Sequence, residues 1–131
     1  MEKTALTLKS RGVRPTLHRL AVAGVLFPSR DHLSAEQVWE KVRAACPAIS
    51  RATVYNTLDL FARKGLVLKR ALRDGAFAYD PVLKPHHHLV EEETDKVYDI
   101  PWEAVKVPCE ISVPGFEVSD FHLVIRGKRK K

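Results

Sequence analysis

Residues 50–80 read SRATVYNTLDLFARKGLVLKRALRDGAFAYD, and they predict a helix followed by a β-hairpin. Ser50 is a good N-cap for a helix, and Gly65 suits the end of that helix. Beyond Gly65 the pattern becomes strand-like, with two short strands predicted around Asp74-Gly75, a strong hairpin sequence. The predicted helix is amphipathic, because its apolar face is formed by Val54, Leu58 and Phe61.

Three further helices are predicted before this stretch. A short one covers residues 4–10, and Thr16 can cap a second that reads LHRLAVAGVLF. Ser34 opens a third, and Gln37 three residues later completes a capping box. Helices followed by a hairpin, with a short amphipathic basic helix last, predict a winged helix-turn-helix domain over residues 1–80.

The helix from Ser50 is the predicted DNA-reading element. Recognition helices present their N-terminal residues to base edges in the major groove. Arginine can bind guanine or phosphate, and asparagine can read adenine. An amphipathic helix with a solvated basic face is the alternative, but the predicted domain around this helix favours DNA. The predicted contacts are Arg51, Thr53, Tyr55 and Asn56 near its start and Arg63, Lys64 and Arg70 beyond.

Charge is distributed unevenly along the 131 residues, whose net charge is +6. Residues 1–75 carry 14 Lys and Arg against 6 Asp and Glu, whereas residues 76–125 carry 3 against 10. A basic half is suited to a polyanion such as DNA. No apolar run is long enough for a spanning helix, and no secretory signal is recognisable, so we expect no membrane partner. The two cysteines form no CxxC pair, which favours a reducing cytoplasm.

The second segment, residues 81–126, predicts a small β-rich domain. HHHLVEEE and DKVYDI form a predicted hairpin, and FEVSDFHLVI is typical of a longer strand. A helix of about two turns is expected from Pro101. Because so small a sheet is marginal alone, we expect a homodimer. The fold class is therefore α+β, with a winged helix-turn-helix domain, a small α/β dimerisation and metal-sensing domain, and a basic tail at 127–131.

Histidines carry the chemistry of this second segment. His86 and His88 share one face of a predicted strand, and His87 takes the other. Asp80 lies at the end of the predicted wing, Asp99 ends the strand that follows the histidine strand, and His32 lies between two predicted helices. Imidazoles and carboxylates without thiolates suit Fe(II), Mn(II), Zn(II) or Ni(II). A solvated histidine loop is the simpler alternative, and an Fe(II) oxygenase is the enzymatic one. An enzyme is not expected, because no substrate-binding motif accompanies the DNA-reading helix.

Several motifs together resemble the ferric uptake regulator (Fur) family of bacterial metal- and redox-responsive repressors. GVRPTLHR at 12–19 is similar to the family's opening motif, and A-T-V-Y at 52–55 matches the core of its recognition helix. HHHL at 86–89 and VSDFHLVIRG at 118–127 resemble its sheet. The resemblance implies a dimer that binds operator DNA, which we expect to be AT-rich and palindromic. In the opening motif, Arg14 and Arg19 are further predicted DNA contacts.

Within the family, the chain most resembles the peroxide-sensing PerR branch. That branch is known for a regulatory site of three histidines and two aspartates, which map here to His32, Asp80, His86, His88 and Asp99. The resemblance implies Fe(II) or Mn(II) at this site, with Zn(II) possible in purified protein. It also implies that peroxide oxidises His32 or His86 when Fe(II) is bound. The alternative is a metal-supply regulator for iron, manganese or zinc without peroxide sensing.

The chain departs from the family at the structural zinc site. Relatives hold that zinc with two CxxC pairs, but the first pair's positions are Glu91 and Thr94 here. The second pair would fall at and beyond Arg129, where the sequence is basic. We therefore expect no structural zinc held by four cysteines. A second regulatory site is also expected to be incomplete, because Phe121 takes the place of a ligand histidine.

Overall fold

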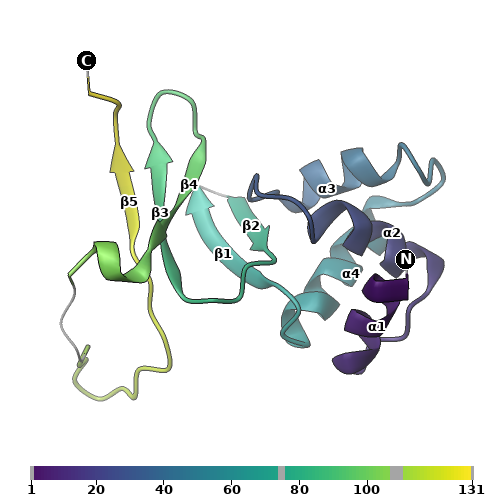
Figure 1. The fold of residues 1–131 in the computed structure, drawn as a ribbon, viewed down its shortest axis with the longest axis horizontal. Helices are drawn as coiled ribbons and strands as arrows, with labels where there is room; N and C mark the ends of the chain where they lie inside the picture. Colours follow the sequence, from purple (N-terminus) through teal and green to yellow (C-terminus); the bar gives the residue numbers. More distant parts are fainter. Residues whose placement is uncertain (1, 74–75, 107–110, 131) are drawn as a thin grey trace. The chain divides into compact units, whose positions relative to one another are not determined.

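The structure, a computed structural model, describes residues 2–73, 76–106 and 111–130. The chain divides into two compact units, Met1–Leu83 and Lys84–Lys131. The first holds the α-helices and a two-stranded sheet, and the second holds a three-stranded sheet (Figure 1). This mixture of helices and separate small sheets confirms the predicted α+β class. None of the described helices is long and apolar enough to cross a membrane.

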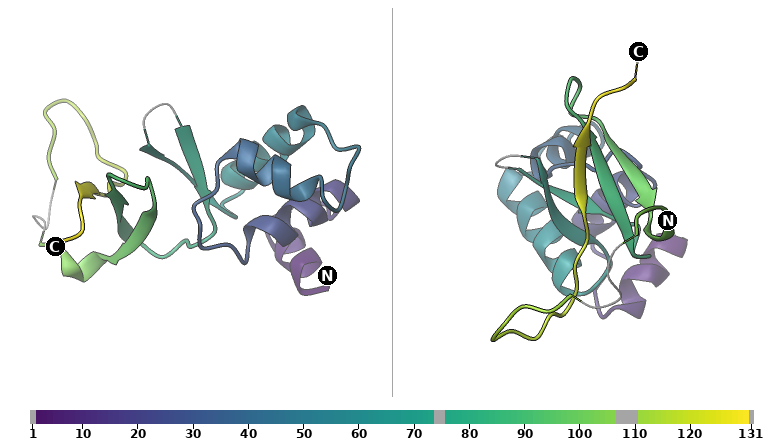
Figure 2. Two further views of the ribbon diagram at one scale, coloured as in Figure 1. Left: turned by 90° about the horizontal axis from the view of Figure 1, so that it is seen from above. Right: turned by 90° about the vertical axis from the view of Figure 1, so that its left-hand side faces the viewer.

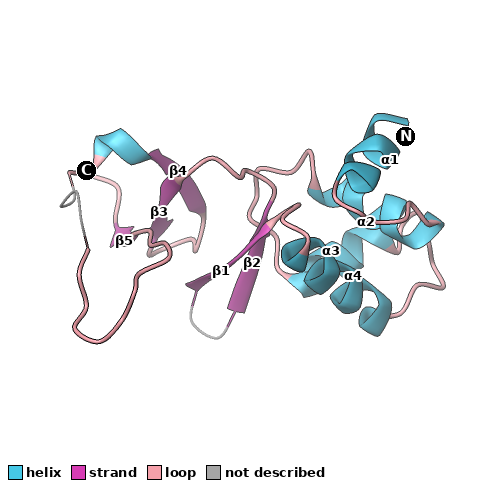
Figure 3. Cartoon of the chain, turned by 90° about the horizontal axis from the view of Figure 1, so that it is seen from below, coloured by secondary structure: helices cyan, strands magenta, loops and turns pink. Residues whose placement is uncertain are grey.

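The helices of the first unit begin where the sequence places their caps. The Thr16 hydroxyl accepts the Arg19 amide N–H, and the Ser50 hydroxyl accepts the Thr53 amide N–H. Ser34 and Gln37 form the complete capping box. These side chains satisfy backbone donors that a helix start leaves without intrahelical partners. The helices, drawn in cyan in Figure 3, are α1 (Glu2–Ser10), α2 (Leu17–Leu26), α3 (Ala35–Val42) and α4 (Arg51–Arg63).

The core of this unit lies between the helices. Leu26, Val38, Leu58 and Phe61 have no exposed surface, and they come from α2, α3 and α4. Burying the Phe61 side chain alone stabilises the fold by about 2–3 kcal/mol. Gly65 ends α4 with a left-handed backbone, φ 73°, a conformation that glycine adopts without steric cost. The predicted amphipathic helix and its stop are therefore confirmed.

A two-stranded antiparallel sheet follows α4 and forms the wing. It pairs β1 (Leu68–Arg73) with β2 (Ala76–Asp80), and Leu68 lies opposite Asp80. The predicted turn residues Asp74 and Gly75 lie outside the described residues. An isolated antiparallel bridge joins Leu33, in the loop between α2 and α3, to Tyr79 in β2. The end of the wing is thereby tied to the helical part of the same unit.

The sheet of the second unit has the order β4-β3-β5. The predicted hairpin is confirmed: β3 (His86–Glu91) pairs antiparallel with β4 (Val97–Pro101). A third strand, β5 (Val124–Gly127), lies on the side of β3 opposite β4 and pairs with β3 in parallel (Figure 2). The antiparallel register places His88 directly opposite Asp99. A single turn of 3-10 helix, η1 (Trp102–Ala104), follows β4.

Two sequence predictions for this unit were wrong. The long strand predicted over 116–125 is confined to β5, because residues 117–123 are irregular and the ladder with β3 begins only at Val124. The helix predicted from Pro101 is only η1 within the described residues. Val105 already has an extended backbone, φ −119° and ψ 123°, as expected for a β-branched residue with low helix propensity. Residues 107–110, including Pro108, lie outside the described residues.

Candidate metal centre and DNA-reading helix

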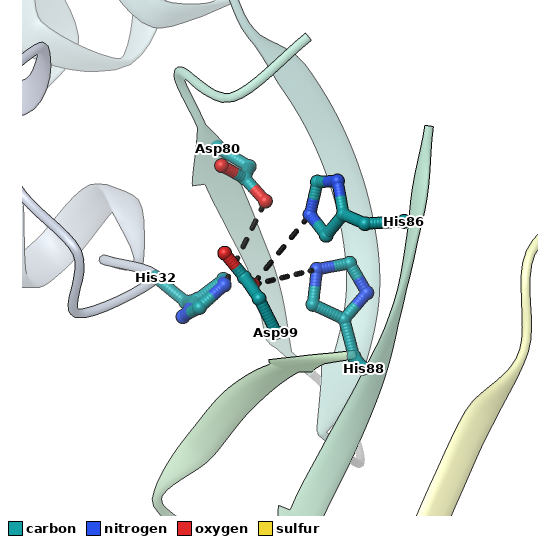
Figure 4. Close-up of side chains that lie close together, drawn as sticks. All are labelled: His32, Asp80, His86, His88 and Asp99. Carbon is teal, nitrogen blue, oxygen red and sulfur yellow. Dashed lines mark ion pairs between the residues drawn. The ribbon is translucent and has the colours of Figure 1, made fainter. Parts of the chain in front are cut away.

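In the first unit, the Leu33–Tyr79 bridge brings a histidine and an aspartate together. The bridge is antiparallel, so the next pair outward is His32 and Asp80. The His32 Nε2 atom lies 3.6 Å from Asp80 Oδ2, and these side chains are only 4% and 3% exposed (Figure 4). The other carboxylate oxygen of Asp80, Oδ1, accepts the Val82 amide N–H at 2.9 Å. That hydrogen bond holds the carboxylate in the orientation that faces His32.

In the second unit, His86, His88 and Asp99 form a group of three metal-ligand donors. Strand alternation places the two histidines on one face of β3, and the antiparallel register adds Asp99 from β4. Asp99 Oδ1 lies 3.6 Å from His86 Nε2 and 3.7 Å from His88 Nε2 (Figure 4). One ligand atom of each residue lies within 4.8 Å of those of the other two. The hairpin alone is therefore enough to gather these donors.

A backbone carbonyl just before β3 determines which ring nitrogen of His86 carries a proton. Its Nδ1 atom lies 2.6 Å from the Lys84 carbonyl oxygen. Because a carbonyl can only accept, Nδ1 carries a proton, and Nε2 is therefore the nitrogen that offers a lone pair in the neutral ring, on the side of Asp99. A ligating histidine commonly has this arrangement, in which the second ring nitrogen donates to a carbonyl.

The donor chemistry of both groups fits a divalent transition metal. Neutral imidazole nitrogens and carboxylate oxygens are ligands for Fe(II), Mn(II) and Zn(II), and neither group contains a thiolate. The separations of 3.6–3.7 Å exceed normal hydrogen-bond lengths and suit donors that share an ion. The predicted residues of each unit thus lie together, His32 with Asp80 and His86 with His88 and Asp99. Their role as ligands of one metal stays a prediction.

His87 points to the opposite face of β3 and has a different environment. Its ring has no exposed surface and stacks on Trp102 at 4.2 Å between ring centroids. The Leu123 amide N–H donates to His87 Nδ1 at 2.9 Å. Burial, followed by the neighbouring histidines, lowers the pKa of His87. This histidine is therefore a neutral packing residue of the second unit.

Sequence reasoning missed one contact near this group. His122 lies edge-on to His88, with 5.3 Å between the ring centroids. Side-chain alternation places His122 on the face opposite Phe121, but no local pattern predicts its contact with His88, because residues 117–123 form irregular structure.

On α4, two of the predicted reading residues contact one acidic side chain of α3. Arg51 donates to both carboxylate oxygens of Glu36 at 3.0–3.2 Å, and the Tyr55 hydroxyl donates to Glu36 at 3.2 Å. Thr53 takes part in the N-cap of α4, because its amide and hydroxyl both contact the Ser50 hydroxyl. Asn56 is exposed. Sequence reasoning missed Glu36, because no motif links residues 15 positions apart.

The remaining predicted DNA contacts also lie in the first unit. Arg63 and Lys64 are exposed at the end of α4, and Arg70 is half-buried on β1. Before α2, Arg14 is exposed, and its carbonyl oxygen accepts an Nη1–H of Arg19 at 3.1 Å. All of the predicted contacts are in the helix-and-wing unit, but their contact with DNA stays a prediction.

A helix-turn-helix with a wing, combined with a small sheet unit and clustered histidine and aspartate side chains, is the architecture expected of a metal-responsive DNA-binding regulator. The comparisons agree. Residues 10–126 match the model of the ferric uptake regulator family. The peroxide operon regulator of Bacillus subtilis (strain 168) is 33% identical over 123 residues, covering 92% of this chain and 85% of that protein. The ferric uptake regulation protein of Rhizobium leguminosarum bv. viciae is 31% identical over 120 residues, covering 89% and 84%.

A solved structure shows the same fold. The ferric uptake regulator from Pseudomonas aeruginosa with manganese superposes with a TM-score of 0.73 at 27% identity, covering 98% of each chain. The chain therefore belongs to the ferric uptake regulator family, whose members are DNA-binding, dimeric, metal-responsive transcription regulators. The family resemblance drawn from the sequence is confirmed.

Proposed function

We propose that this protein is a metal-dependent transcriptional repressor that senses hydrogen peroxide by oxidation of its ligand histidines. The observation that carries the proposal is the arrangement of His86, His88 and Asp99. Two imidazole Nε2 atoms lie within 3.7 Å of one aspartate oxygen on a two-stranded hairpin. Such a cluster of hard and intermediate donors suits a regulatory Fe(II) or Mn(II) ion.

We infer that the pair of the first unit completes this site. His32, Asp80, His86, His88 and Asp99 would then bind one ion with three nitrogens and two oxygens. Support comes from the chain itself, since Asp80 and His86 are six residues apart and their Cα atoms are at most about 20 Å apart. An ion that takes ligands from both units would favour one arrangement of the DNA-binding unit over others, because ligands shift populations by differential affinity.

The protein's own groups prepare these ligands. The Lys84 carbonyl holds the proton of His86 on Nδ1, and the Val82 amide orients Asp80. Both contacts fix a donor before any ion binds, which reduces the ordering cost of binding.

Peroxide would act on the histidines that hold the ion. Bound Fe(II) supplies the redox chemistry that cleaves hydrogen peroxide, whereas Mn(II) reacts poorly. The imidazole of His32 or His86 gains one oxygen atom, and the peroxide that loses it becomes water. The oxidised ring would be a weaker ligand, so the site would release its ion and the protein would release the operator. Such an oxidation would be regulatory rather than enzymatic chemistry, because each reaction consumes one of the metal-ligating histidines.

A second candidate is a metal-supply regulator of the same fold. It is favoured by the 31% identity to a ferric uptake regulation protein and by the structural match to a regulator with manganese. Such a protein would use the same ligands and the same operator binding but would not be inactivated by peroxide. In both cases we expect a homodimer that binds a palindromic, AT-rich operator in the cytoplasm.

Operator release distinguishes these candidates. The full chain, loaded anaerobically with Fe(II) or Mn(II), is bound to a double-stranded fragment selected from a randomised library, and hydrogen peroxide is then added. The proposal predicts rapid release of the Fe(II) form and retention of the Mn(II) form. Retention of both forms would favour the metal-supply regulator. DNA binding that is the same with and without either metal would contradict metal dependence altogether. A His18→Ala variant is the matched control, because His18 is an exposed histidine outside both donor groups.

A further inference from the structure

Glu36 holds Arg51 by one particular edge of its guanidinium group. Arg51 Nε lies 3.2 and 3.1 Å from the two carboxylate oxygens, and Nη2 lies 3.0 Å from Oε1. The contact joins the first turn of α3 to the first residue of α4. Although the Arg51 side chain is 60% exposed, three hydrogen bonds therefore fix the plane of its guanidinium.

Trp39 supports the same guanidinium from its face. The Arg51 Cζ atom lies 4.0 Å from the centroid of the Trp39 ring, within the range of a cation–π contact. The indole is itself fixed, because its Nε1–H donates to the Ile49 carbonyl oxygen at 3.1 Å. Trp39 packs partly buried against the core and is also a platform for Arg51.

These contacts leave one edge of Arg51 directed away from its protein partners. A guanidinium has five N–H donors in a planar fork. Glu36 takes the edge formed by Nε and Nη2, so the end formed by Nη1 and the outer hydrogen of Nη2 still offers two parallel donors. A guanine presents two acceptors, O6 and N7, in the major groove at the spacing of such a pair.

We propose that Glu36 is a positioning residue that orients Arg51 to read a guanine of the operator. The inference rests on the proposed function in one respect, namely that α4 binds DNA. Arg51 is the first residue of α4, and the start of a recognition helix is the part that faces the bases.

A guanine explains Glu36 better than a phosphate does. A carboxylate beside Arg51 offsets its charge and adds repulsion to the DNA backbone, so it would weaken a simple phosphate contact. A fixed guanidinium plane improves binding only where the direction of the N–H donors matters, as in a bidentate contact with a base. Glu36 also accepts the Tyr55 hydroxyl, and therefore holds two predicted reading residues in one arrangement.

The test compares base preference in Glu36→Gln and Glu40→Gln. Both variants remove one negative charge from α3, but only Glu36 makes the hydrogen bonds to Arg51. The Mn(II)-loaded full chain selects fragments from a randomised double-stranded library, and the preference at each position is measured. We expect wild type and Glu40→Gln to select guanine at one position of each half-site. Glu36→Gln should lose at least about fivefold of that preference, the lower end of what a bidentate contact contributes.

A second variant keeps the test independent of how Glu36→Gln folds. Arg51→Lys retains the positive charge but has no planar fork, so it should lose the same guanine preference while still binding DNA. Unchanged base preference in both Glu36→Gln and Arg51→Lys would overturn the inference. If Glu36→Gln then also bound all sequences more tightly than the wild type, the role of Glu36 would be purely electrostatic. A wild-type protein that selects no sequence would instead contradict DNA reading by α4, and the inference with it.

Discussion

Leu33 and Tyr79 form an antiparallel backbone bridge in which the Tyr79 amide N–H donates to the Leu33 carbonyl oxygen at 2.9 Å. This single pairing joins the loop before α3 to the second strand of the wing. It places His32 beside Asp80, whose facing atoms are 3.6 Å apart. Two of the five proposed metal ligands are thus brought together by backbone pairing rather than by side-chain packing.

The backbone of His32 gives the first prediction. Its φ is 54°, a left-handed conformation that is unfavourable for residues with a Cβ atom. In His32→Gly and His32→Ala the imidazole is lost equally, but only alanine retains the steric cost. We expect the glycine variant to be more stable by about 1 kcal/mol, the reverse of the usual order. Urea unfolding of the metal-free proteins measures the difference, and an alanine variant of equal or greater stability would contradict this backbone conformation.

Removal of one ligand tests the metal centre. His88→Ala should weaken Mn(II) binding by at least about a hundredfold, because even changes to groups behind the ligands cost about 10- to 100-fold. Isothermal titration calorimetry of the full chain gives the affinity and the stoichiometry. His18→Ala should bind as the wild type does, since His18 is exposed and lies in neither donor group. Equal affinity in both variants would exclude His88 from the ligand set.

The ion pair between Glu36 and Arg51 has a measurable titration. The hydrogen bond from Arg51 is the largest cause that lowers the pKa of Glu36 below its usual 4.5. A carboxyl group with a lowered pKa stabilises the fold above its unfolded-state pKa and loses that contribution as the pH falls through its folded-state pKa. NMR titration of the Glu36 carboxyl should show the lowered pKa in the wild type and a higher one in Arg51→Ala. The same pKa in both proteins would show that the pair does not form in solution.

Mutating a residue that contacts phosphate should change the salt dependence of DNA binding and leave the base preference unchanged. Lys64 is exposed at the end of α4, and we expect it to contact the DNA backbone. Lys64→Ala should weaken binding to all sequences alike and reduce the slope of log affinity against log salt by about 0.9. Fluorescence anisotropy at several salt concentrations measures this slope. An unchanged slope, or a loss confined to one sequence, would remove Lys64 from the phosphate contacts.

Local features of the fold could be predicted from the sequence. The caps at Thr16, Ser34 and Ser50 depend on residues within one helical turn, so the sequence contains the whole signal. The grouping of His86 and His88 follows from strand alternation, and the hairpin brings Asp99 opposite His88. These are interactions between near neighbours along the chain or across one turn.

Long-range features could not be predicted in this way. The Leu33–Tyr79 bridge joins segments 46 positions apart, and neither segment carries a signal for the other. The contact of Glu36 with Arg51 likewise depends on how α3 packs against α4. The apolar residues of the segment before β5 are typical of a strand, whereas the ladder with β3 begins only at Val124.

The most direct test of the central claim locates the oxygen that peroxide adds. The full chain is loaded anaerobically with Fe(II), treated with hydrogen peroxide, digested and analysed by peptide mass spectrometry, with the Mn(II) form treated in parallel. We expect one added oxygen on the peptide that carries His32 or His86 in the Fe(II) form and none in the Mn(II) form. Unmodified peptides from a protein that demonstrably binds Fe(II) would contradict peroxide sensing and leave metal supply as the signal.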